Sequence, residues 1–299
     1  MINLLRYVMR HPLCRDHKLL ALRRVVSWQI ASRMMGVPLV LPFTKETRLV
    51  VERGNTGATG NYYCGLHEFE DMAFVLNLLR PEDLFVDIGA NIGSYTILAS
   101  GESRARTIAV EPLPETFHRL RTNVRANDLD ELVTLKNLGI GDSETTLRFT
   151  KSFDTVNHVA TDADEGTEQT EVPVIPLDLL LADEEPICIK IDVEGFEQQV
   201  VDGGPGTLQG QGLQAVLLEL NGSGKRYGYD DQAIHDAMIE FGFTPFLYDP
   251  FQRELTGLEG RNTGAGNTLY LRDIEFVQQR LDSAPEIALA WRTLGPPKS

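Results

Sequence analysis

The sequence contains two groups of polar residues whose spacing could bind and activate a small molecule, and the first begins at Asp87. This aspartate ends an apolar run that predicts a buried strand, and Gly89, Asn91 and Gly93 follow it before a predicted helix. In open parallel sheets, ligands bind at the carboxyl ends of strands, and glycines let the backbone approach them. The spacing is not GxGxxG, because Asn91 replaces the second glycine and Ser94 stands at the last position. It therefore disfavours a pyrophosphate ligand.

An acidic side chain at this loop repels phosphate and attracts a cation. Glu111 ends the next predicted strand, 24 residues after Asp87, close to the ~20-residue offset expected for a carboxylate that binds a ribose. A ligand with a cationic centre and a ribose suits both residues, and S-adenosylmethionine, which carries a sulfonium, is such a ligand. The alternative is that the glycine loop only connects a strand to a helix. The two acids together favour the cofactor site.

Two further carboxylates could complete this cofactor site. Asp142 follows Gly141 in the loop after a third predicted strand, where it could accept a hydrogen bond from the adenine amino group. Glu68 stands at the start of a predicted helix, where it could contact the ammonium end of the cofactor. Both have a structural alternative, because Gly-Asp is common in turns and carboxylates are stabilised at helix N-termini.

The second group lies at the end of a predicted strand near Asp192. Lys190 and Asp192 share one face of that strand, because side chains alternate along it, and Glu194 follows in the same loop. This cluster could meet the methyl donor and a substrate hydroxyl, with Asp192 or Glu194 accepting the proton. Two alternatives stay open. Lys190 could form a structural ion pair with Glu219, or Asp192, Glu194 and Glu219 could hold a hard divalent cation.

Short apolar runs alternate with helical segments, and this alternation predicts the framework that positions both groups. It is the pattern of a parallel sheet flanked by helices. The predicted fold class is therefore α/β, with one doubly wound, mostly parallel sheet of seven strands. The predicted strands are Leu84–Ile88, Thr107–Glu111, Val133–Asn137, Ile187–Asp192, Ala215–Leu220, Pro245–Tyr248 and Thr268–Leu271.

The charge divides the chain into a basic N-terminal segment and an acidic body. The 299 residues carry a net charge of −15, but residues 1–60 hold ten Lys and Arg against three Asp and Glu, so they carry +7 and the rest −22. The acidic body argues against nucleic acid as a partner. Three units are predicted: a basic helical arm at 1–60, joined through the glycine-rich link Gly54–Gly60; a cofactor-binding domain at 61–271; and a helical tail at 272–299.

Residues Arg15–Met35 in the arm predict an amphipathic helix with a basic polar face. The expected role of its apolar residues, among them Leu19, Leu22, Val26 and Ile30, is to pack on their own domain. Two alternatives concern partners. The arm could lie on an anionic membrane surface as a peripheral contact, or it could contact the acidic body of a second copy in a homodimer.

The three cysteines, Cys14, Cys64 and Cys188, have no CxxC spacing, so they predict neither a disulfide framework nor a zinc site. No apolar run approaches the ~20 residues needed to span a bilayer, and arginines interrupt the N-terminal apolar residues. These features predict a protein of a reducing compartment, the cytoplasm.

Several motifs carry a resemblance to a known family. They are Val86–Gly93, Glu111–Pro114 with Asn123 and Asn127 behind it, Leu177–Asp178 and Ile189–Glu197, of which the last is the most specific. Through them the sequence resembles the FkbM-type S-adenosylmethionine-dependent methyltransferases over about residues 61–271. The resemblance implies a Rossmann-like class I methyltransferase with a reversed last strand. It also implies O-methylation of a hydroxyl on a sugar or glycan, a polyketide or another secondary metabolite.

The resemblance also implies roles for individual residues, and two other classes of function compete with it. One is a methyltransferase-like domain that only binds or scaffolds, which the intact acids count against. The other is a nicotinamide-dependent oxidoreductase, which requires a pyrophosphate beside Asp87. The implied cofactor residues are Asp87, Gly89, Asn91 and Glu111, and the implied substrate-facing cluster is Lys190, Asp192 and Glu194.

Overall fold

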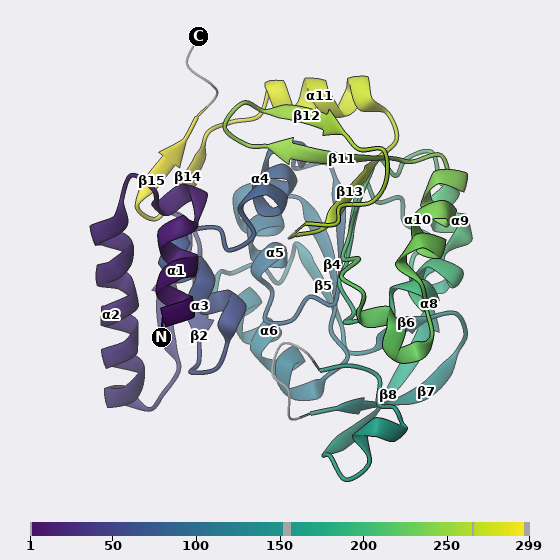
Figure 1. Ribbon diagram of the computed structural model, residues 1–299, viewed down its shortest axis with the longest axis horizontal. Coiled ribbons are helices and arrows are strands. Elements are labelled where there is room, and N and C mark those ends of the chain that lie inside the picture. The colour runs from purple at the N-terminus through teal and green to yellow at the C-terminus, as the bar shows by residue number, and fades with distance from the viewer. Residues whose placement is uncertain (1, 152–156, 265, 296–299) are drawn as a thin grey trace.

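The computed structural model describes residues 2–151, 157–264 and 266–295, and an eight-stranded sheet runs through its centre (Figure 1). In sheet order the strands are β12 (Glu254–Gly257), β11 (Thr244–Asp249), β13 (Thr268–Leu271), β10 (Ala215–Leu218), β9 (Cys188–Ile191), β3 (Leu84–Ile88), β4 (Arg106–Val110) and β5 (Val133–Lys136). The strands from β10 to β5 run parallel to one another. β13 runs antiparallel to both of its neighbours, and β12 runs antiparallel to β11.

All seven predicted strands are present, with bounds that differ from the prediction by at most two residues. The predicted number of strands is wrong, because β12 adds an eighth at the edge. β12 has the sequence Glu-Leu-Thr-Gly, and its residues are exposed or half-buried. No apolar run marks such a strand in the sequence, because it is held by backbone pairing with β11 and little by burial.

Helices cover both faces of the sheet, as the predicted doubly wound fold requires (Figure 1). Alternate residues of one strand join the two cores: Phe85 of β3 packs in the first, and Val86 in the second. Strands buried on both faces form continuous apolar runs, which is why the sequence predicts them well. The helices of the first face include α4 (Phe69–Leu78), α5 (Ser94–Ile97) and α6 (Pro114–Ala126), and those of the second α8 (Glu197–Asp202), α9 (Pro205–Gln209) and α10 (Asp231–Glu240).

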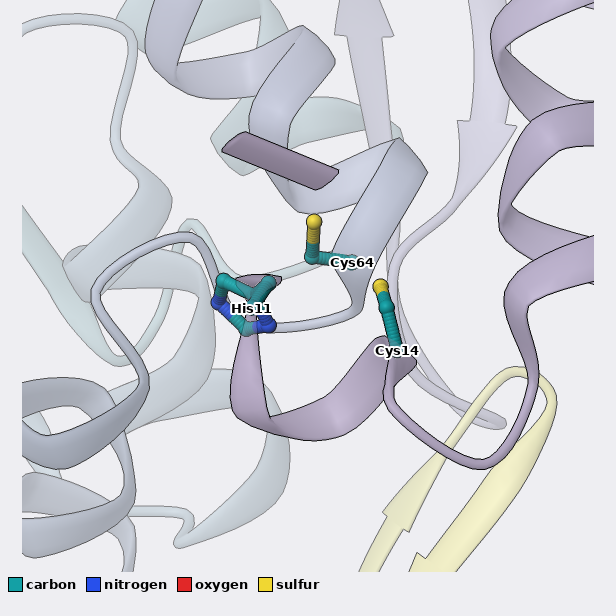
Figure 2. Close-up of side chains that lie close together, drawn as sticks. All are labelled: His11, Cys14 and Cys64. Atoms are coloured by element: carbon teal, nitrogen blue, oxygen red, sulfur yellow. The ribbon is translucent and has the colours of Figure 1, made fainter. Parts of the chain in front are cut away.

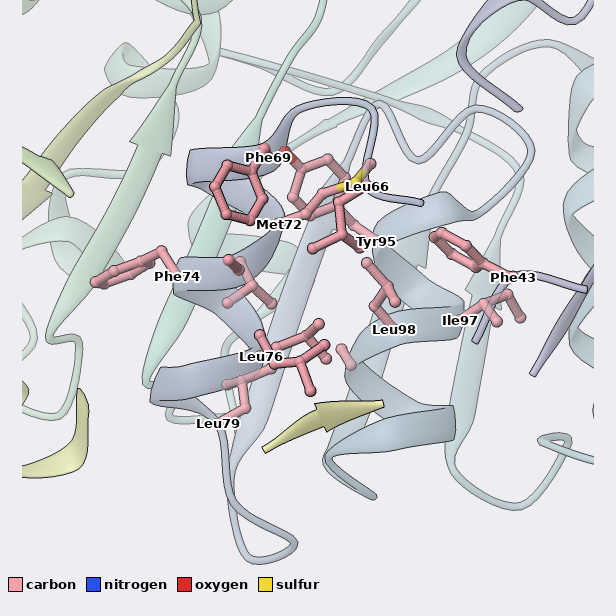
Figure 3. Packing of buried hydrophobic residues seen from close by; sticks show 14 of the residues in the cluster. Phe43, Leu66, Phe69, Met72, Phe74, Leu76, Leu79, Tyr95, Ile97 and Leu98 are labelled. Carbon is pink, nitrogen blue, oxygen red and sulfur yellow. The ribbon is translucent and has the colours of Figure 1, made fainter. Parts of the chain in front are cut away.

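Helix α4 is central to the first core. Figure 3 shows Met72 and Leu76 of α4 facing Tyr95 and Leu98 of the segment that follows β3. Met72, Tyr95 and Leu98 are at most 5% exposed. This packing fixes the segment after β3 against α4, so it also positions the glycine loop between β3 and α5.

The N-terminal residues are part of the same body and do not form a separate arm. They fold as α1 (Ile2–Arg10), a 3-10 turn (Pro12–Cys14), α2 (Lys18–Met35), the hairpin β1 (Leu39–Pro42) and β2 (Arg48–Val51), and α3 (Thr56–Cys64). Val8, Trp28 and Phe43 are buried in the core that contains α4. The sequence does not reveal this packing, because the net charge of residues 1–60 gives no information on what their apolar side chains contact.

The predicted link at Gly54–Gly60 is wrong, because residues from Thr56 onward form α3. Glycine composition predicts a flexible connection, but Ala58, Tyr63 and other buried residues hold this segment as a helix, so packing overrides propensity. Gly60 itself is required by a close approach: a Cβ there would lie 2.3 Å from Nδ1 of His67.

Helix α2 carries apolar residues on two sides. Val25 and Trp28 are buried against the body, as predicted for a helix that packs on its own domain. The prediction is wrong for the other side, where the exposed fractions of five large apolar residues range from 41% to 84%. Within the described residues, no helix combines the length and apolar character needed to cross a membrane. The exposed apolar residues on this side are Leu19, Leu22, Val26, Ile30 and Met34, and Met35 at the end of the helix is exposed as well.

The C-terminal segment is only partly the helical tail that the sequence predicts. It begins with α11 (Ile274–Asp282) but continues as a hairpin of β14 (Ile287–Leu289) and β15 (Arg292–Leu294), and the end of the predicted tail, 296–299, lies outside the described residues. Trp291 at the hairpin turn packs on the N-terminal segment, with its ring 5.0 Å from the Arg24 guanidinium. The hairpin of β14 and β15 therefore packs beside the N-terminal helices (Figure 1).

Candidate functional site

The loops after β3, β4, β9 and β10 meet where the order of the strands reverses. From β3 the sheet continues through β4 and β5 on one side, and through β9 and β10 on the other. Ligands of open α/β sheets bind at this point. A cavity of about 270 Å³ lies there, and its walls include Asp87, Glu111, Asp192 and Glu194. The structure therefore brings the two predicted groups of acids into one cavity.

Asp87 is buried in the wall of this cavity, only 1% exposed. Its Oδ2 accepts hydrogen bonds from the backbone N–H and the hydroxyl of Thr96, at 3.1 and 2.7 Å. Its Oδ1 has no hydrogen-bond partner among the described residues. Burial raises the pKa of Asp87, and the charge of Lys190, its neighbour across β3 and β9, opposes that shift. The unpaired Oδ1 is free to accept a hydrogen bond from a ligand.

The glycine loop is shaped by the protein's own packing. A Cβ on Gly89, whose φ is +79°, would lie 1.8 Å from the carbonyl oxygen of Asp192, and one on Gly93 would lie 2.6 Å from Leu120. Contacts with Asp192 and α6 thus require these glycines, and the close approach of a ligand to Gly89, which lines the cavity, stays a prediction. Asn91 adopts a φ of +52°, and its Oδ1 accepts a hydrogen bond from the Ile92 N–H at 2.8 Å.

Glu111 directly follows β4 and is 5% exposed. Its Oε2 accepts a hydrogen bond from the Asn91 N–H, and its Oε1 accepts one from the Leu113 N–H, both at 3.0 Å. Burial raises the pKa of Glu111 to about 7, although these two bonds lower it. Each carboxylate oxygen keeps a further lone pair. The side chain is therefore fixed in one orientation and can still accept two hydrogen bonds from a diol.

Asp142 does not reach the cavity. It follows β6 (Gly139–Gly141), which pairs with β8 (Gln169–Pro176) in a small sheet completed by β7 (Thr145–Thr150), and its side chain is exposed. Gly203, at the end of α8, packs so tightly against Gly141 that a Cβ would lie 1.9 Å from its carbonyl oxygen. Leu138 and Ile140 line the cavity, and Asp142 is not among its lining residues. The role of Asp142 at adenine stays a prediction.

Glu68 lies in the cavity wall, as the sequence suggests. It precedes α4, and its Oε2 accepts a hydrogen bond of 2.6 Å from the hydroxyl of Tyr95. The ring of Tyr95 in turn lies 4.9 Å from Nζ of Lys190, within the range of a cation–π contact. Glu68 is thus linked through Tyr95 to the second group of polar residues.

Lys190 forms its ion pair with Asp192, because Nζ lies 2.6 Å from Oδ2 of that residue. The predicted shared face of these two side chains is confirmed, whereas the alternative ion pair between Lys190 and Glu219 is not the one formed. Lys190 is 3% exposed. Burial lowers the pKa of Lys190, but the negative charges of Asp192 and Glu68 raise it by more than burial lowers it. The ammonium group therefore stays cationic.

The carboxylates of Asp192, Glu194 and Glu219 lie within 4.8 Å of one another. Burial and the charge of Asp192 raise the pKa of Glu194 to about 7 and that of Glu219 to about 9. Glu219 therefore holds its proton at neutral pH, and Glu194 is poised between its two forms. Glu194 has a φ of +55°, an uncommon conformation outside glycine that clusters at functional sites.

Glu197 is a positioning residue that the sequence does not reveal. It is 3% exposed, and its Oε1 accepts hydrogen bonds from the N–H groups of Val193 and Gly195, both at 3.1 Å. These bonds close the loop that carries Asp192 and Glu194. In the sequence, Glu197 is one of several acids in a cluster. Nothing in the sequence distinguishes an acid that binds the backbone of its own loop from an acid that faces the cavity.

The N-terminal segment also contributes to the cavity, which the sequence analysis missed. Residues 55–58 and Asn61, from the start of α3 and just before it, line the wall together with His67. Asn61 donates a hydrogen bond to Oγ of Ser94 at 3.0 Å and accepts one from the His67 N–H at 2.7 Å. No motif or spacing marks Asn61, because its partners lie on segments that only the fold brings together.

Solved structures of methyltransferases resemble this chain at low similarity. Precorrin-6y C5,15-methyltransferase from Geobacter metallireducens GS-15 matches with a TM-score of 0.39 and 14% identity, over 70% of this chain and 89% of that one. A methyltransferase from Pyrococcus furiosus matches with a TM-score of 0.40 and 12% identity, over 84% and 98% of the two chains. M. jannaschii TYW2 in complex with AdoMet matches with a TM-score of 0.37 and 13% identity, over 76% and 82%.

A curated relative and a family model match the sequence itself. Hexuronic acid methyltransferase AglP of Haloferax volcanii is 28% identical over 157 residues, which are 52% of this chain and 62% of the relative. The chain thus spans less than two thirds of that relative's length. The model of the methyltransferase FkbM domain matches residues 87–245, more than half of the chain and including both groups of acids. The chain therefore belongs to the FkbM methyltransferase family.

Proposed function

We propose that this protein transfers a methyl group from S-adenosylmethionine to a hydroxyl of a sugar or glycan. The observation that carries the proposal is the single cavity whose walls include Asp87, Glu111, Asp192 and Glu194. Family membership supports methyl transfer, and the name of the relative, a hexuronic acid methyltransferase, supports a sugar acceptor. Other hydroxylated metabolites remain the wider class of acceptor.

The residues on the cofactor side fit S-adenosylmethionine. Glu111 presents two oxygens with free lone pairs to the ribose hydroxyls, and the unpaired Oδ1 of Asp87 offers a site for the amino group. When bound, the cofactor supplies an electrophilic methyl group on a sulfonium. The carboxylates of Glu68, Asp87 and Glu111 make the cavity favourable for that positive charge.

Glu194 is the proposed proton acceptor for the substrate hydroxyl. Oδ2 of Asp192 already accepts a strong bond from Lys190, and Glu219 holds its proton at neutral pH. A general base works best when its pKa is near the working pH, and the pKa of Glu194 is about 7. The hydroxyl oxygen forms the new bond to the methyl carbon as the bond to sulfur breaks, and its proton goes to Glu194. Lys190 and Asp192 orient the acceptor beside it.

The affinity for S-adenosylmethionine should increase with pH through Glu111. The pKa of this carboxyl is raised to about 7, so its ionised form, which accepts both ribose hydroxyls, is lost as the pH falls through that value. If only the ionised form binds tightly, affinity at pH 6 is about 10-fold weaker than at pH 8. Calorimetry across this range measures the effect. The variant Glu111→Gln should bind more weakly at every pH and lose the dependence, and a dependence that persists in the variant would assign it to another group.

Binding experiments separate the competing classes of function. The proposal expects S-adenosylmethionine to bind and NAD not to displace it, because the glycine loop lacks a pyrophosphate pattern. Displacement by NAD would favour an oxidoreductase. Binding without methylation of any hydroxylated acceptor would favour a scaffold. The alternative cation site at Asp192, Glu194 and Glu219 predicts a requirement for Mg²⁺ or Mn²⁺, whereas the proposal expects equal rates with and without them.

We further propose that helix α2 contacts an anionic membrane surface. Its outer side exposes Leu19, Leu22, Val26, Ile30 and Met34 at spacings of three and four residues. Residues 15–35 carry five Lys and Arg against the single acid Asp16. An exposed apolar stripe flanked by cations suits the interface of an anionic bilayer. Such a contact would place the enzyme near a lipid-linked glycan.

The double variant Val26→Glu/Ile30→Glu should bind phosphatidylglycerol vesicles at least ~10-fold more weakly than the wild type, because two apolar side chains are lost from the buried face. Vesicle co-sedimentation measures it. The matched control Leu179→Glu/Ile239→Glu changes two exposed apolar residues elsewhere and adds the same charge. Deleting residues 1–53 is unsuitable, because it removes buried core residues. The membrane proposal is contradicted if the wild type does not bind the vesicles. If the wild type also forms a dimer that the α2 variant abolishes, the exposed apolar residues of α2 belong to a homodimer interface.

A further inference from the structure

A second cluster of side chains that could bind a metal ion lies outside the cavity, where the N-terminal 3-10 turn meets the end of α3. It comprises His11, Cys14 and Cys64, whose ligand atoms all lie within 4.8 Å of one another (Figure 2). His11 precedes the 3-10 turn, Cys14 is its last residue, and Cys64 ends α3. His11 is 6% exposed, and both cysteines are fully buried. The spacing of the cysteines in the sequence predicts no zinc site, because 50 residues separate the two thiols.

We propose that His11, Cys14 and Cys64 bind a divalent zinc-type ion. Thiolate and imidazole are the ligands that Zn²⁺ takes in structural sites, and the edge of a tetrahedral site with these ligands is ~3.8 Å. The observed separations need only a small contraction around the ion. Two thiolates and a neutral imidazole also cancel the charge of a divalent ion, which a buried site requires. This proposal is independent of the methyl-transfer proposal.

The hydrogen bonds of His11 orient it as a ligand. Its Nε2 lies 3.3 Å from the carbonyl oxygen of His67, and its Nδ1 lies 3.3 Å from the Leu13 N–H. The tautomer that satisfies both contacts carries its proton on Nε2 and a lone pair on Nδ1. Metal-bound histidines commonly donate their second N–H to a carbonyl in this way. Nδ1 is therefore the ligand atom, and an ion bound there would replace its 3.3 Å contact with the Leu13 N–H.

Hydrogen bonds to other groups hold the two thiols only weakly. Sγ of Cys14 has only a long contact of 4.0 Å with the carbonyl oxygen of Tyr63. Each thiol must lose its proton to bind the ion as a thiolate, so zinc binding would release protons. The fourth position would fall to the Tyr7 hydroxyl, beside Cys64, or to a water.

An ion at this site would connect the N-terminal turn to the helix that walls the cavity. Residues 56–58 and Asn61 of α3 line that cavity, and Cys64 ends the same helix. Zinc should therefore stabilise the wall of the cavity without entering it. The unfolding midpoint of the full chain should rise by about 5–10 °C with saturating Zn²⁺ over the chelator-stripped protein.

The test is the metal content of the full chain, expressed with added zinc and purified with a non-thiol reductant. Mass spectrometry of the metals should find about one zinc per chain in the wild type and in Cys188→Ala, a matched buried cysteine outside the cluster. Cys14→Ser, Cys64→Ser and His11→Gln should each lose most of it. If these variants fail to fold, Co²⁺ added to the stripped wild type should give thiolate charge-transfer and tetrahedral bands. The proposal is overturned if the folded variants contain as much zinc as the wild type. It is also overturned if the folded wild type contains no zinc and gives no cobalt spectrum, or if Cys14 and Cys64 form a disulfide.

Discussion

The variant Glu194→Gln is expected to transfer methyl groups at least ~100-fold more slowly than the wild type, with unchanged affinity for S-adenosylmethionine. Loss of a general base typically costs this much, and the amide cannot take a proton at neutral pH. Glu194 makes none of the contacts assigned to the cofactor, which involve Asp87 and Glu111, so these contacts remain. The matched control is Glu240→Gln, an exposed glutamate of α10, which should keep the wild-type rate.

The pH profile gives this prediction a second readout. Because the pKa of Glu194 is about 7 and the ionised form is the base, kcat/KM for the acceptor, measured at saturating S-adenosylmethionine, should rise as the pH increases through about 7 and then level off. Glu194→Gln should lose this rise. Asp192→Asn tests the alternative base. A wild-type rate in Glu194→Gln, together with a ~100-fold loss in Asp192→Asn at unchanged cofactor affinity, would assign the proton to Asp192 and contradict the account.

Replacing Glu111 with glutamine should weaken S-adenosylmethionine binding by about 100-fold. Two hydrogen bonds from the ribose lose their charged acceptor, and bonds to charged groups contribute ~1.5–3 kcal/mol each. The amide also turns an NH₂ group toward the N–H of Asn91 or Leu113, where the carboxylate now accepts. Calorimetry measures the affinity, and Glu131→Gln, an exposed glutamate, is the control.

A thermal melt must accompany the Glu111 measurement, because the side chain is buried and anchors the glycine loop. Asp87→Ala should weaken binding as well, since its unpaired Oδ1 is assigned to the cofactor's amino group. Folded Glu111→Gln and Asp87→Ala proteins that both bind S-adenosylmethionine with wild-type affinity would remove the cofactor assignment.

The sequence predicts that Asp87 and Glu111 lie close together because of the geometry of parallel sheets. Asp87 and Glu111 end neighbouring apolar runs, and the carboxyl ends of neighbouring parallel strands must lie together. Lys190 and Asp192 alternate on one strand, so their shared face follows from the backbone alone. These predictions need only the order of the strands and the alternation of side chains between the two faces of each strand.

Other features could not be predicted, because they depend on contacts between distant segments. Gly203 packs on Gly141, directly before Asp142, and no local pattern shows this contact. The N-terminal segment walls the cavity through Asn61, although its charge suggests a detached arm. Cys14 and Cys64 meet only because α3 folds back beside the N-terminal turn. In each case the fold, and not the spacing, selects the partner.

The most direct measurement is transfer of label from methyl-labelled S-adenosylmethionine to acceptors in an extract of the source organism, followed by identification of what is labelled. The account predicts a carbohydrate-containing product whose label resists mild base, as an ether does and an ester does not. The product should form with the wild type and be nearly absent with Glu194→Gln. Label on a carboxyl ester or on nucleic acid, or no labelled product from a protein that binds the cofactor, would contradict it.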